Sequence, residues 1–396
     1  MHIAVIADAY PPLKTSGAVQ IRDLVIELSH QGHEVTVILP DSGLDKAWSS
    51  HQYGSVTELR LKAPRTKDVS YFRRAIAEFR LSSAMYRNFL KTPSCNVKFD
   101  GVAWYSPTIF LGIMVRKLKQ RSSCPSYLML RDIFPEWALD MGLLNKGVIY
   151  HYFKSIEKFQ YRQADFIGVQ TASNIKYFNN EYPELAARVE VLNNWLSTPV
   201  QKHCSIQLEQ TQLAGRKIFA YTGNIGIAQG MEILVDLAEA FRKNRKLGFV
   251  FVGRGTFVEK IRKQIAARQL DNVLLYGEID PDEIAGFLKQ CHIGLVALDP
   301  RHRNDNIPGK FLAYMQAGLP VLATVNAGND LEQMINDNRV GSVITTNSLA
   351  DLVEQAGSLL EQIGKDAEIN VRCRKLALER FSSSAAACQI VAAFNG

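Results

Sequence analysis

Cysteine is scarce in this sequence, and none of it occurs in a paired arrangement. The 396 residues contain six cysteines, which form no C-x-x-C pair and no zinc-ligand spacing. Disulfide-built scaffolds and structural zinc modules are therefore excluded. Scattered cysteines in apolar or helical surroundings are typical of reduced thiols in a cytoplasmic protein, which is the compartment we expect. The cysteines are Cys95, Cys124, Cys204, Cys291, Cys373 and Cys388.

Long apolar runs are also missing. The longest one, residues 102–115, is interrupted by Ser106, Pro107 and Thr108, and it is too short to cross a bilayer. The sequence opens directly with a strand-like segment, MHIAVIA, so we expect no signal peptide.

What is present is the composition of a soluble globular protein. Hydrophobic residues make up 47% of the chain and charged residues 21%, and the length is sufficient for two domains with sizeable cores. The formal net charge of +7 indicates an anionic partner without identifying it.

Apolar runs and amphipathic helices alternate along the chain. A buried strand at residues 2–10, a helix at 19–31 and the strand HEVTVILP form one βαβ unit, and KIFAYTGN begins the same pattern again at residue 217. We therefore predict an α/β fold with two Rossmann-like domains, residues 1–196 and 197–380, joined by a polar connector at 197–216.

The stretch 298–330 contains the strongest local pattern. It follows the apolar run IGLVAL and carries Arg301, Arg303 and the pair Asp305-Asn306 before Pro308 opens a helix that Gly318 ends. We expect the free N–H groups of Gly309, Lys310 and Phe311 to hold a phosphate, aided by the nearby cations. An ordinary crossover helix with solvated charges remains the alternative.

Other polar positions follow predicted strands, where open α/β sheets bind ligands. Gly17 precedes the first helix and lets the backbone pass close to a ligand. Arg131 and Asp132 follow the strand SYLML, where a pair that only caps the next turn is the alternative. Arg254 ends GFVFVGR, and the turn ending at Ile279 could place backbone groups against a nucleobase.

Three segments resemble glycosyltransferase family 4. They are KFLAYMQAGLPV, the opening order PP-x(4)-G, helix, QGHEVTVI, and RDIFPEWALDMGLL. The last resembles a subgroup that includes the N-acetyl-L-fucosamine transferases of bacterial O-antigen assembly. The resemblance implies the GT-B fold, two nucleotide-binding domains facing across a cleft, with a last helix, residues 381–396, that returns to the first domain. It also implies transfer with retention of configuration.

The resemblance assigns roles and exposes departures. It places the donor at Asn224, Gln229, Arg254, Ile279, Arg301, Arg303, Asp305, Asn306, Pro308, Gly309 and Lys310, with Gly17 opposite. At 224 and 229 the family has an arginine and a lysine that contact the diphosphate. Its two glutamates correspond to Asp305 and Ala313, so the ribose contact of the second is lost. A family histidine is replaced by Arg131, while Asp132 is retained. We expect Asp132, Lys310 and Arg131 to be the catalytic residues.

A metal ion is not expected. Asp280-Pro281-Asp282 matches a D-x-D string that binds metal in another transferase fold. Asp280 is better explained as a helix N-cap, with Pro281 in the first turn and Glu283 completing a capping box. We therefore predict no cofactor and no divalent metal, with the nucleotide sugar as substrate. Fixed cations and helix N–H groups would then meet the charge on the leaving diphosphate.

Residues 60–98 are strongly basic. Ten Lys and Arg stand against two acids, an excess of 10 − 2 = +8, and they alternate with large apolar side chains. Such a helix is typical of membrane-surface binding through residues such as Arg73, Arg74 and Arg80. A solvated helix packed on its domain is the alternative. Nucleic acid is not expected, because no recognised motif accompanies the patch.

Together these features predict transfer of an N-acetylated amino sugar, such as N-acetyl-L-fucosamine, from a UDP-sugar. The acceptor implied by the resemblance is a polyprenyl-diphosphate-linked sugar of O-antigen or capsule assembly, reached peripherally on the cytoplasmic face of the inner membrane. Two alternatives stay open. One is a sugar-nucleotide epimerase of the same fold. The other is an inactive nucleotide-sugar-binding protein, suggested by Ala313, Asn224 and Gln229.

Overall fold

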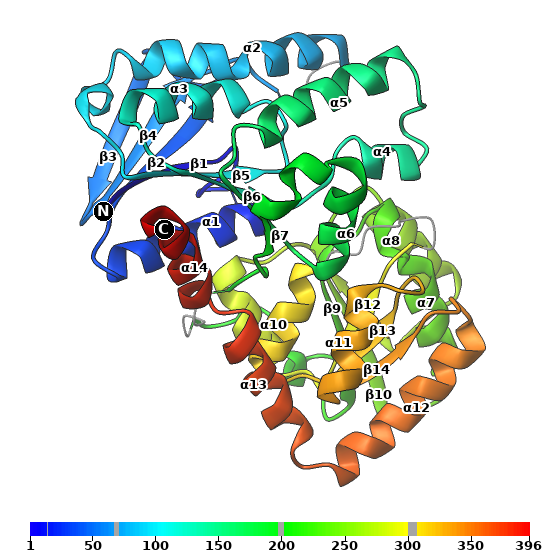
Figure 1. Ribbon diagram of the computed structural model, residues 1–396. Coiled ribbons are helices and arrows are strands. Elements are labelled where there is room, and N and C mark those ends of the chain that lie inside the picture. The colour runs from blue at the N-terminus through cyan, green and yellow to red at the C-terminus, as the bar shows by residue number, and fades with distance from the viewer. Residues whose placement is uncertain (14, 67–70, 197–201, 300–306) are drawn as a thin grey trace. The chain divides into compact units, whose positions relative to one another are not determined.

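The chain forms two compact α/β units (Figure 1). The computed structural model describes residues 1–13, 15–66, 71–196, 202–299 and 307–396, with the backbone alone at 71, 72 and 228. One unit comprises Met1–Ser197 and Ser383–Gly396, and the other comprises Thr198–Ser382. Each unit has one sheet, and the predicted α/β class is confirmed.

The first unit is built on an eight-stranded sheet of order β3-β4-β2-β1-β5-β6-β7-β8. Neighbouring strands are parallel except β3 and β4, which are antiparallel. The strands are β1 (His2–Ile6), β2 (Glu34–Asp41), β3 (Trp48–Tyr53), β4 (Val56–Lys62), β5 (Gly101–Ser106), β6 (Ser126–Leu130), β7 (Phe166–Val169) and β8 (Val189–Val191). The helices are α1 (Ser16–His30), α2 (Tyr71–Phe89), η1 (Pro93–Asn96), α3 (Gly112–Ser122), α4 (Glu136–Asp140), α5 (Val148–Tyr161), α6 (Ala172–Glu181), η2 (Pro183–Arg188) and α14 (Ser383–Asn395).

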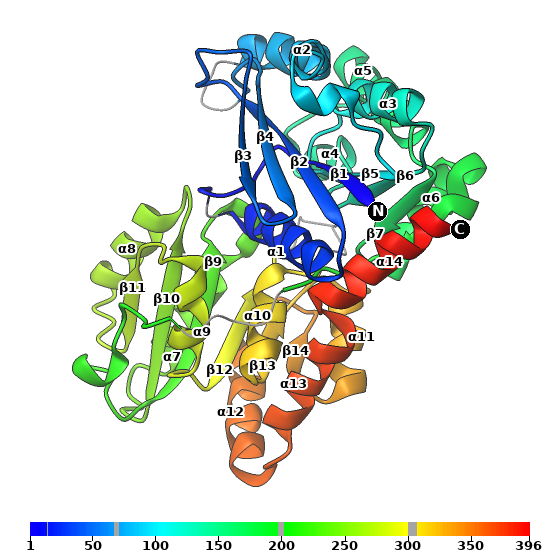
Figure 2. The same ribbon diagram turned by 90° about the vertical axis from the view of Figure 1, so that its left-hand side faces the viewer.

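Helices cover both faces of this sheet (Figure 2). Helices α2, α3 and α5 pack side by side over one core, and α1 packs with α14 over the other. Strands enclosed in this way must be apolar along their whole length, and every residue of β6, SYLML, is buried. Polar chemistry is therefore confined to the strand ends.

The second unit contains a six-stranded parallel sheet of order β11-β10-β9-β12-β13-β14. The strands are β9 (Lys217–Asn224), β10 (Leu247–Arg254), β11 (Val273–Tyr276), β12 (Ile293–Ala297), β13 (Val321–Thr324) and β14 (Gly341–Ile344). The helices are η3 (Leu208–Gln210), η4 (Ile227–Gln229), α7 (Met231–Ala240), α8 (Val258–Ala267), η5 (Pro281–Glu283), α9 (Ile284–Leu288), α10 (Gly309–Ala317), α11 (Asp330–Asn338), α12 (Leu349–Lys365) and α13 (Ile369–Arg380).

Each sheet reverses its strand order once. In the first unit the reversal lies between β1 and β5, and in the second it lies between β9 and β12. Loops leave the carboxyl ends of such neighbouring strands in opposite directions and open a crevice in which α/β proteins bind ligands. These two switch points therefore locate the candidate sites.

The acidic turn at Asp280 is a helix start, with one difference from the expectation. The Asp280 carboxylate accepts a bond from the amide of Asp282 at 3.0 Å, and Pro281 opens η5. The predicted capping box is wrong, because the Glu283 carboxylate accepts from the amide of Ser205 at 2.7 Å instead. Glu283 thus ties η5 to a segment distant in sequence.

A buried charge network joins α4, α5, α6 and η2. Glu157 is fully buried, and one of its oxygens lies 2.5 Å from the ammonium nitrogen of Lys154. Lys154 also pairs with Glu136 at 2.8 Å. Hydroxyls of Tyr182 and Tyr161 donate to Glu157 at 2.6 and 2.9 Å. A buried carboxylate needs such partners, because leaving its charge unpaired is costly.

This network predicts the effect of Lys154→Met. The variant leaves Glu157 ionised and buried, so we expect a loss of about 3–5 kcal/mol in unfolding free energy near neutral pH. Burial raises the pKa of Glu157. A carboxyl group whose pKa is higher in the folded state destabilises the fold while it is ionised. The loss of unfolding free energy in Lys154→Met should therefore shrink as the pH falls and Glu157 becomes protonated.

Urea denaturation at neutral and acidic pH measures this difference. Lys158→Met is the matched control, since Lys158 pairs at 3.4 Å with the exposed Glu184, and we expect little change from it. Equal stability losses in the two variants would contradict the role given to Lys154.

Candidate functional site

In the second unit, Lys310 lies at the switch point between β9 and β12. It is the second residue of α10, and its ammonium nitrogen donates to the Tyr221 hydroxyl at 2.6 Å. The same nitrogen lies 3.9 Å from the centre of the Tyr221 ring. Burial of the ammonium group lowers the pKa of Lys310 to about 7. An ammonium group in such surroundings gains strongly from an arriving anion, because it has given up much of its water.

The turn after β9 lies close to Lys310. Gly223, near the end of β9, has a φ of +121°, and a β-carbon there would lie 3.5 Å from Cε of Lys310. The Tyr221 hydroxyl donates to the carbonyl oxygen of Asn224 at 2.5 Å. Tyr221 therefore fixes both the lysine and the turn that follows β9.

The start of α10 differs slightly from the expectation. Pro308 has an extended backbone and is the N-cap, so the helix begins at Gly309. The Phe311 amide is not free, because it donates to the Pro308 carbonyl at 2.9 Å. The amides of Gly309 and Lys310 have no partner among the described residues. Two of the three expected donors therefore remain for a phosphate.

Tyr314, one turn after Lys310, anchors α10 to the sheet. Its hydroxyl accepts from the Thr222 amide at 3.0 Å and donates to the Leu295 carbonyl at 3.2 Å. These partners lie on β9 and β12, the two strands of the switch point. By anchoring α10 to these strands, Tyr314 also fixes the position of Lys310 on the same helix.

The two positions where the family has cations hold a bonded amide pair. The Asn224 side-chain nitrogen donates to the Gln229 side-chain oxygen at 2.9 Å, and this oxygen also accepts from the Gly226 amide at 3.2 Å. The second contact completes η4 at its start. Asn224 and Gln229 therefore brace the loop after β9 and bring no charge to it.

Arg254 and Ile279 lie on the same edge of the sheet. The Arg254 guanidinium pairs with Glu278 at 3.0 Å, so part of its charge is already matched. More than half of its side chain is exposed, and such a pair is weak enough to exchange for a ligand. Ile279 lies in the loop after β11, and a β-carbon at the neighbouring Gly277 would meet open space.

Several predicted donor residues lie outside the described residues, namely Arg301, Arg303, Asp305 and Asn306. Ala313, where the family has its second glutamate, is described and partly buried on α10. Its methyl group offers no acceptor for ribose hydroxyls.

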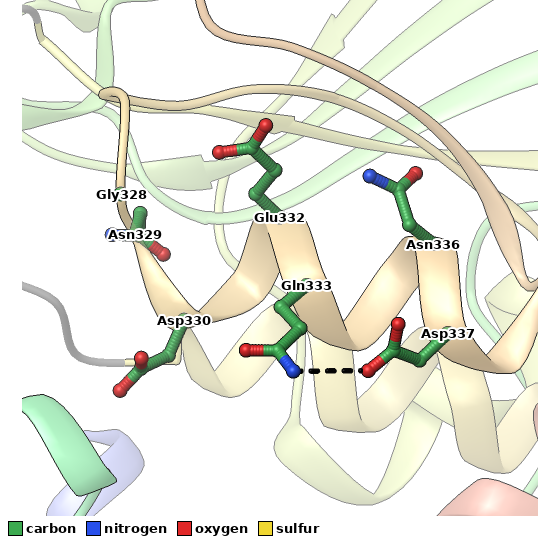
Figure 3. A pocket seen from close by; sticks show the side chains of 7 residues that line it. All are labelled: Gly328, Asn329, Asp330, Glu332, Gln333, Asn336 and Asp337. Carbon is green, nitrogen blue, oxygen red and sulfur yellow. Dashed lines mark hydrogen bonds between the residues drawn. The ribbon is translucent and has the colours of Figure 1, made fainter.

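A hollow beside α11 does not fit an anionic ligand (Figure 3). It is lined by Gly328, Asn329, Asp330, Glu332, Gln333, Asn336 and Asp337. The Gln333 amide donates to Asp337 at 3.1 Å. Three carboxylates and no cation make this lining unsuitable for a diphosphate. No group of three or more His, Cys, Asp or Glu suited to a metal occurs among the residues that the structure describes.

In the first unit, Arg131 supports the sheet edge. It is buried, its Nη1 donates to the Leu192 carbonyl at 2.9 Å, and its guanidinium carbon lies 4.7 Å from the centre of the Trp195 ring. Burial lowers the pKa of Arg131 to about 10. These contacts hold the end of β6 against the segment after β8, which is a positioning role.

Asp132 follows Arg131 and is only partly buried. Desolvation raises the pKa of its carboxyl group, and the Arg131 charge opposes the shift. The carboxylate has no hydrogen-bond partner among the described residues. Of the two neighbours, Asp132 is thus the one free to meet a substrate.

Gly17 has a local explanation. A β-carbon at this position would lie 3.0 Å from the Tyr105 ring, so glycine lets α1 pack against β5. The Tyr105 hydroxyl donates to the Gln20 side chain at 3.1 Å, and the Trp195 indole donates to the Gln20 carbonyl at 2.8 Å. Gly17 therefore serves the packing of this edge, and its role in ligand approach stays a prediction.

Sequence reasoning missed several residues that organise these edges. Gln170 donates to the Arg131 carbonyl at 2.6 Å, and Asn194 donates to Gln170 at 2.7 Å. Tyr221 and Tyr314 hold Lys310 and its helix. Tyr221 and Tyr314 lie in segments that the sequence pattern identified, and its position after a strand could have singled out Gln170. The spacing of residues in the sequence does not predict the hydrogen bonds that the hydroxyl groups of the two tyrosines make.

The basic segment divides into a core face and an outer face on α2. Leu81, Met85 and Phe89 are buried in the core of the unit, as the alternative of a helix packed on its domain requires. They pack because the helix must cover the sheet. Arg73, Arg74 and Arg80 are exposed, with Arg74 paired to Glu78 at 2.8 Å.

The second unit matches a known family. Residues 216–362 match the model described as Glycosyl transferases group 1. The chain is 26% identical over 239 residues to a protein named as a glycosyltransferase, WbjE, of Pseudomonas aeruginosa, and the alignment covers 58% of each chain. It is 25% identical over 368 residues to WcaI of Escherichia coli (strain K12), named as a colanic acid biosynthesis glycosyl transferase, with 84% of this chain and 86% of the relative covered.

Solved structures share the whole fold. Sucrose-phosphate synthase from Thermosynechococcus elongatus has a TM-score of 0.77 at 15% identity, covering 100% of this chain and 98% of that one. Anabaena Alr3699/HepE in complex with UDP-glucose has a TM-score of 0.68 at 15% identity, covering 99% of both. The strand orders, the switch points and these matches together show a glycosyltransferase of the GT-B fold, and residues 216–362 of its second unit are similar to the glycosyl transferases group 1 family.

Proposed function

We propose that this protein transfers a sugar from a UDP-sugar to a polyprenyl-diphosphate-linked sugar in the assembly of a bacterial surface polysaccharide. The observation that carries the proposal is Lys310, a partly desolvated cation at the start of α10 and at the switch point of a group 1 domain. Two relatives named as glycosyltransferases support the class, and one of them is named for colanic acid biosynthesis.

The donor is proposed to be a nucleotide sugar with a UDP group. The neighbour Alr3699/HepE binds UDP-glucose on the same fold. In this chain the diphosphate would meet Lys310 and the amides of Gly309 and Lys310, with Arg254 released from Glu278. Fixed donors of this kind stabilise the charge that develops on the leaving group. RDIFPEW favours an N-acetylated amino sugar, with N-acetyl-L-fucosamine as the first candidate.

The proposed reaction exchanges one bond to the anomeric carbon for another. The bond from that carbon to the β-phosphate oxygen breaks, and UDP leaves with the electron pair. The oxygen of an acceptor hydroxyl forms the new bond, and its proton is released. We propose retention of configuration, as the family resemblance implies. No divalent metal is proposed, since cations of the chain itself would meet the diphosphate.

The acceptor is proposed to approach Asp132 in the first unit. This carboxylate lies at the end of β6, and it is the sheet-edge group there that is partly exposed. A polyprenyl chain would require the protein to work at the cytoplasmic face of the inner membrane. No described helix is long and apolar enough to cross a bilayer. We propose peripheral contact through the exposed outer arginines of α2, with each one near an anionic surface contributing about 1 kcal/mol.

Donor profiling tests the proposal directly. Purified protein is offered a panel of UDP-sugars with a synthetic polyprenyl-diphosphate sugar, and we expect one N-acetylated donor to be consumed with UDP release. Epimer exchange without the acceptor would support an epimerase. Absence of turnover, with UDP-sugar still bound, would support the inactive binding protein suggested by Ala313.

Lys310 gives a pH prediction for donor binding. A lysine with a pKa of about 7 is charged below this pH and neutral above it, so UDP-sugar affinity should fall as the pH rises through 7. Lys310→Met should bind more weakly at pH 6, remove this dependence, and slow transfer by about 10²–10³. Calorimetric titration of UDP-glucose is suitable, since its diphosphate does not titrate in this range. The same pH dependence in both proteins would place the phosphate elsewhere.

Asp132→Asn separates the acceptor side from the donor side. The variant keeps the size of the side chain and removes its charge, so we expect transfer to slow by about 10²-fold or more. UDP-sugar affinity should not change, because Asp132 belongs to the other unit. Unchanged turnover in a folded Asp132→Asn protein would exclude the carboxylate from the reaction.

A further inference from the structure

Four exposed apolar side chains of the first unit lie close together in sequence, after α4 and on the first turns of α5. Val148 is 87% exposed, Leu143 67%, Ile149 62% and Tyr152 41%. All four fall within ten consecutive residues of the segment 143–152, which we call the α4–α5 segment. Single exposed apolar residues are common on protein surfaces, but a group this dense marks an interaction surface.

The α4–α5 segment itself contains no acidic residue. After Asp140 the next acidic residue is Glu157, and the residues between them include Lys146, His151 and Lys154. Lys146 and His151 are exposed, while Lys154 is committed to its buried network. An exposed apolar group in a segment that has an exposed lysine and no acidic residue of its own is complementary to an anionic lipid surface.

Contacts with Glu136 of α4 hold the start of α5 in place. The hydroxyl of Tyr150 donates to Glu136 at 3.1 Å, and Lys154 pairs with the same carboxylate at 2.8 Å. These bonds clamp the first turns of α5 to α4. Val148 and Ile149 are therefore presented on a fixed turn of helix, and their exposure does not come from a frayed end.

The same helical layer carries the basic helix α2. Helices α2, α3 and α5 pack in one layer on the sheet, as both views show (Figure 1, Figure 2). On α2, Ile76 is 45% and Phe79 63% exposed, next to the exposed Arg73 and Arg80. Both exposed apolar groups thus belong to one side of the first unit.

We infer that the α4–α5 segment is an apolar anchor that inserts into the interfacial region of an anionic bilayer, with α2 as its electrostatic partner. Val148 and Ile149 enter the acyl boundary, while Lys146 and the arginines of α2 stay at the level of the phosphates. Insertion of this kind depends on apolar area and persists at high salt, whereas the attraction of α2 is screened. The inference rests on the proposed membrane-linked acceptor and names the surface that reaches it.

The test uses the full chain and sedimentation with phosphatidylcholine vesicles, with and without phosphatidylglycerol. Val148→Ser with Ile149→Ser should lower the partition coefficient about tenfold at both low and high salt. Arg73→Glu with Arg74→Glu should remove only the part that depends on anionic lipid and falls with salt. The matched control is Val371→Ser with Leu378→Ser, two residues of α13 that are 48% and 75% exposed, and it should bind as the unchanged protein does.

Three outcomes would overturn the inference. The unchanged protein could ignore vesicles, the Val148/Ile149 variant could bind as before, or light scattering could show that this variant only turns a dimer into a monomer. The last result would make the surface a contact between copies of the chain.

A water-soluble acceptor analogue separates this inference from the proposed function. Transfer to that analogue should be equal in the unchanged protein and the Val148/Ile149 variant. Transfer with no change in vesicle binding would disprove the anchor alone. Reduced vesicle binding without transfer to any acceptor would disprove the proposed reaction alone.

Discussion

Strands covered on both faces by helices can present polar groups only at their ends, and this constraint determines where chemistry occurs in both units. In β6 all five residues are buried, and the first charged side chains come immediately after it, at Arg131 and Asp132. In the second unit, the loops after β9 and β12 leave from the point where the strand order reverses. Every group assigned a chemical role here lies within a few residues of a strand end, apart from Lys310, which opens the helix after β12.

At the described positions, the donor edge contains less positive charge than the family resemblance implies. Asn224 and Gln229 bond to each other, and Arg254 is paired with Glu278. Lys310 differs from these because burial has removed much of its hydration, and the described residues supply no counterion. One poorly solvated cation beside a helix start can favour a phosphate more than several well-hydrated ones, since less water is displaced when the anion arrives.

The fold and the location of the sites could be predicted from sequence, and the contacts within the sites could not. Apolar runs such as IGLVAL and SYLML predicted the strands, and parallel strands then fix which loops meet at one edge. Sequence spacing does not show that the Tyr221 ring lies against Lys310, because this contact depends on how α10 packs against β9 in three dimensions. The sequence could not assign Met85 and Phe89 of α2 to a face, since an amphipathic helix offers apolar residues equally to a core and to a membrane. The helix starts near Pro308 and Glu283 each differ from the prediction by one hydrogen bond, and sequence patterns do not specify single hydrogen bonds.

The return of α14 to the first unit links the order of synthesis to the order of folding. Ala387, Ile390 and Phe394 belong to the core beneath α1, and the Phe394 ring occupies the space where a side chain at Gly101 would be. These residues follow the entire second unit in the sequence. On the ribosome, the second unit can therefore complete its fold while the first still exposes the apolar surface that α14 will cover. The domain made first is thus the one finished last, and until then its open face is available to chaperones or to misassociation with other nascent chains.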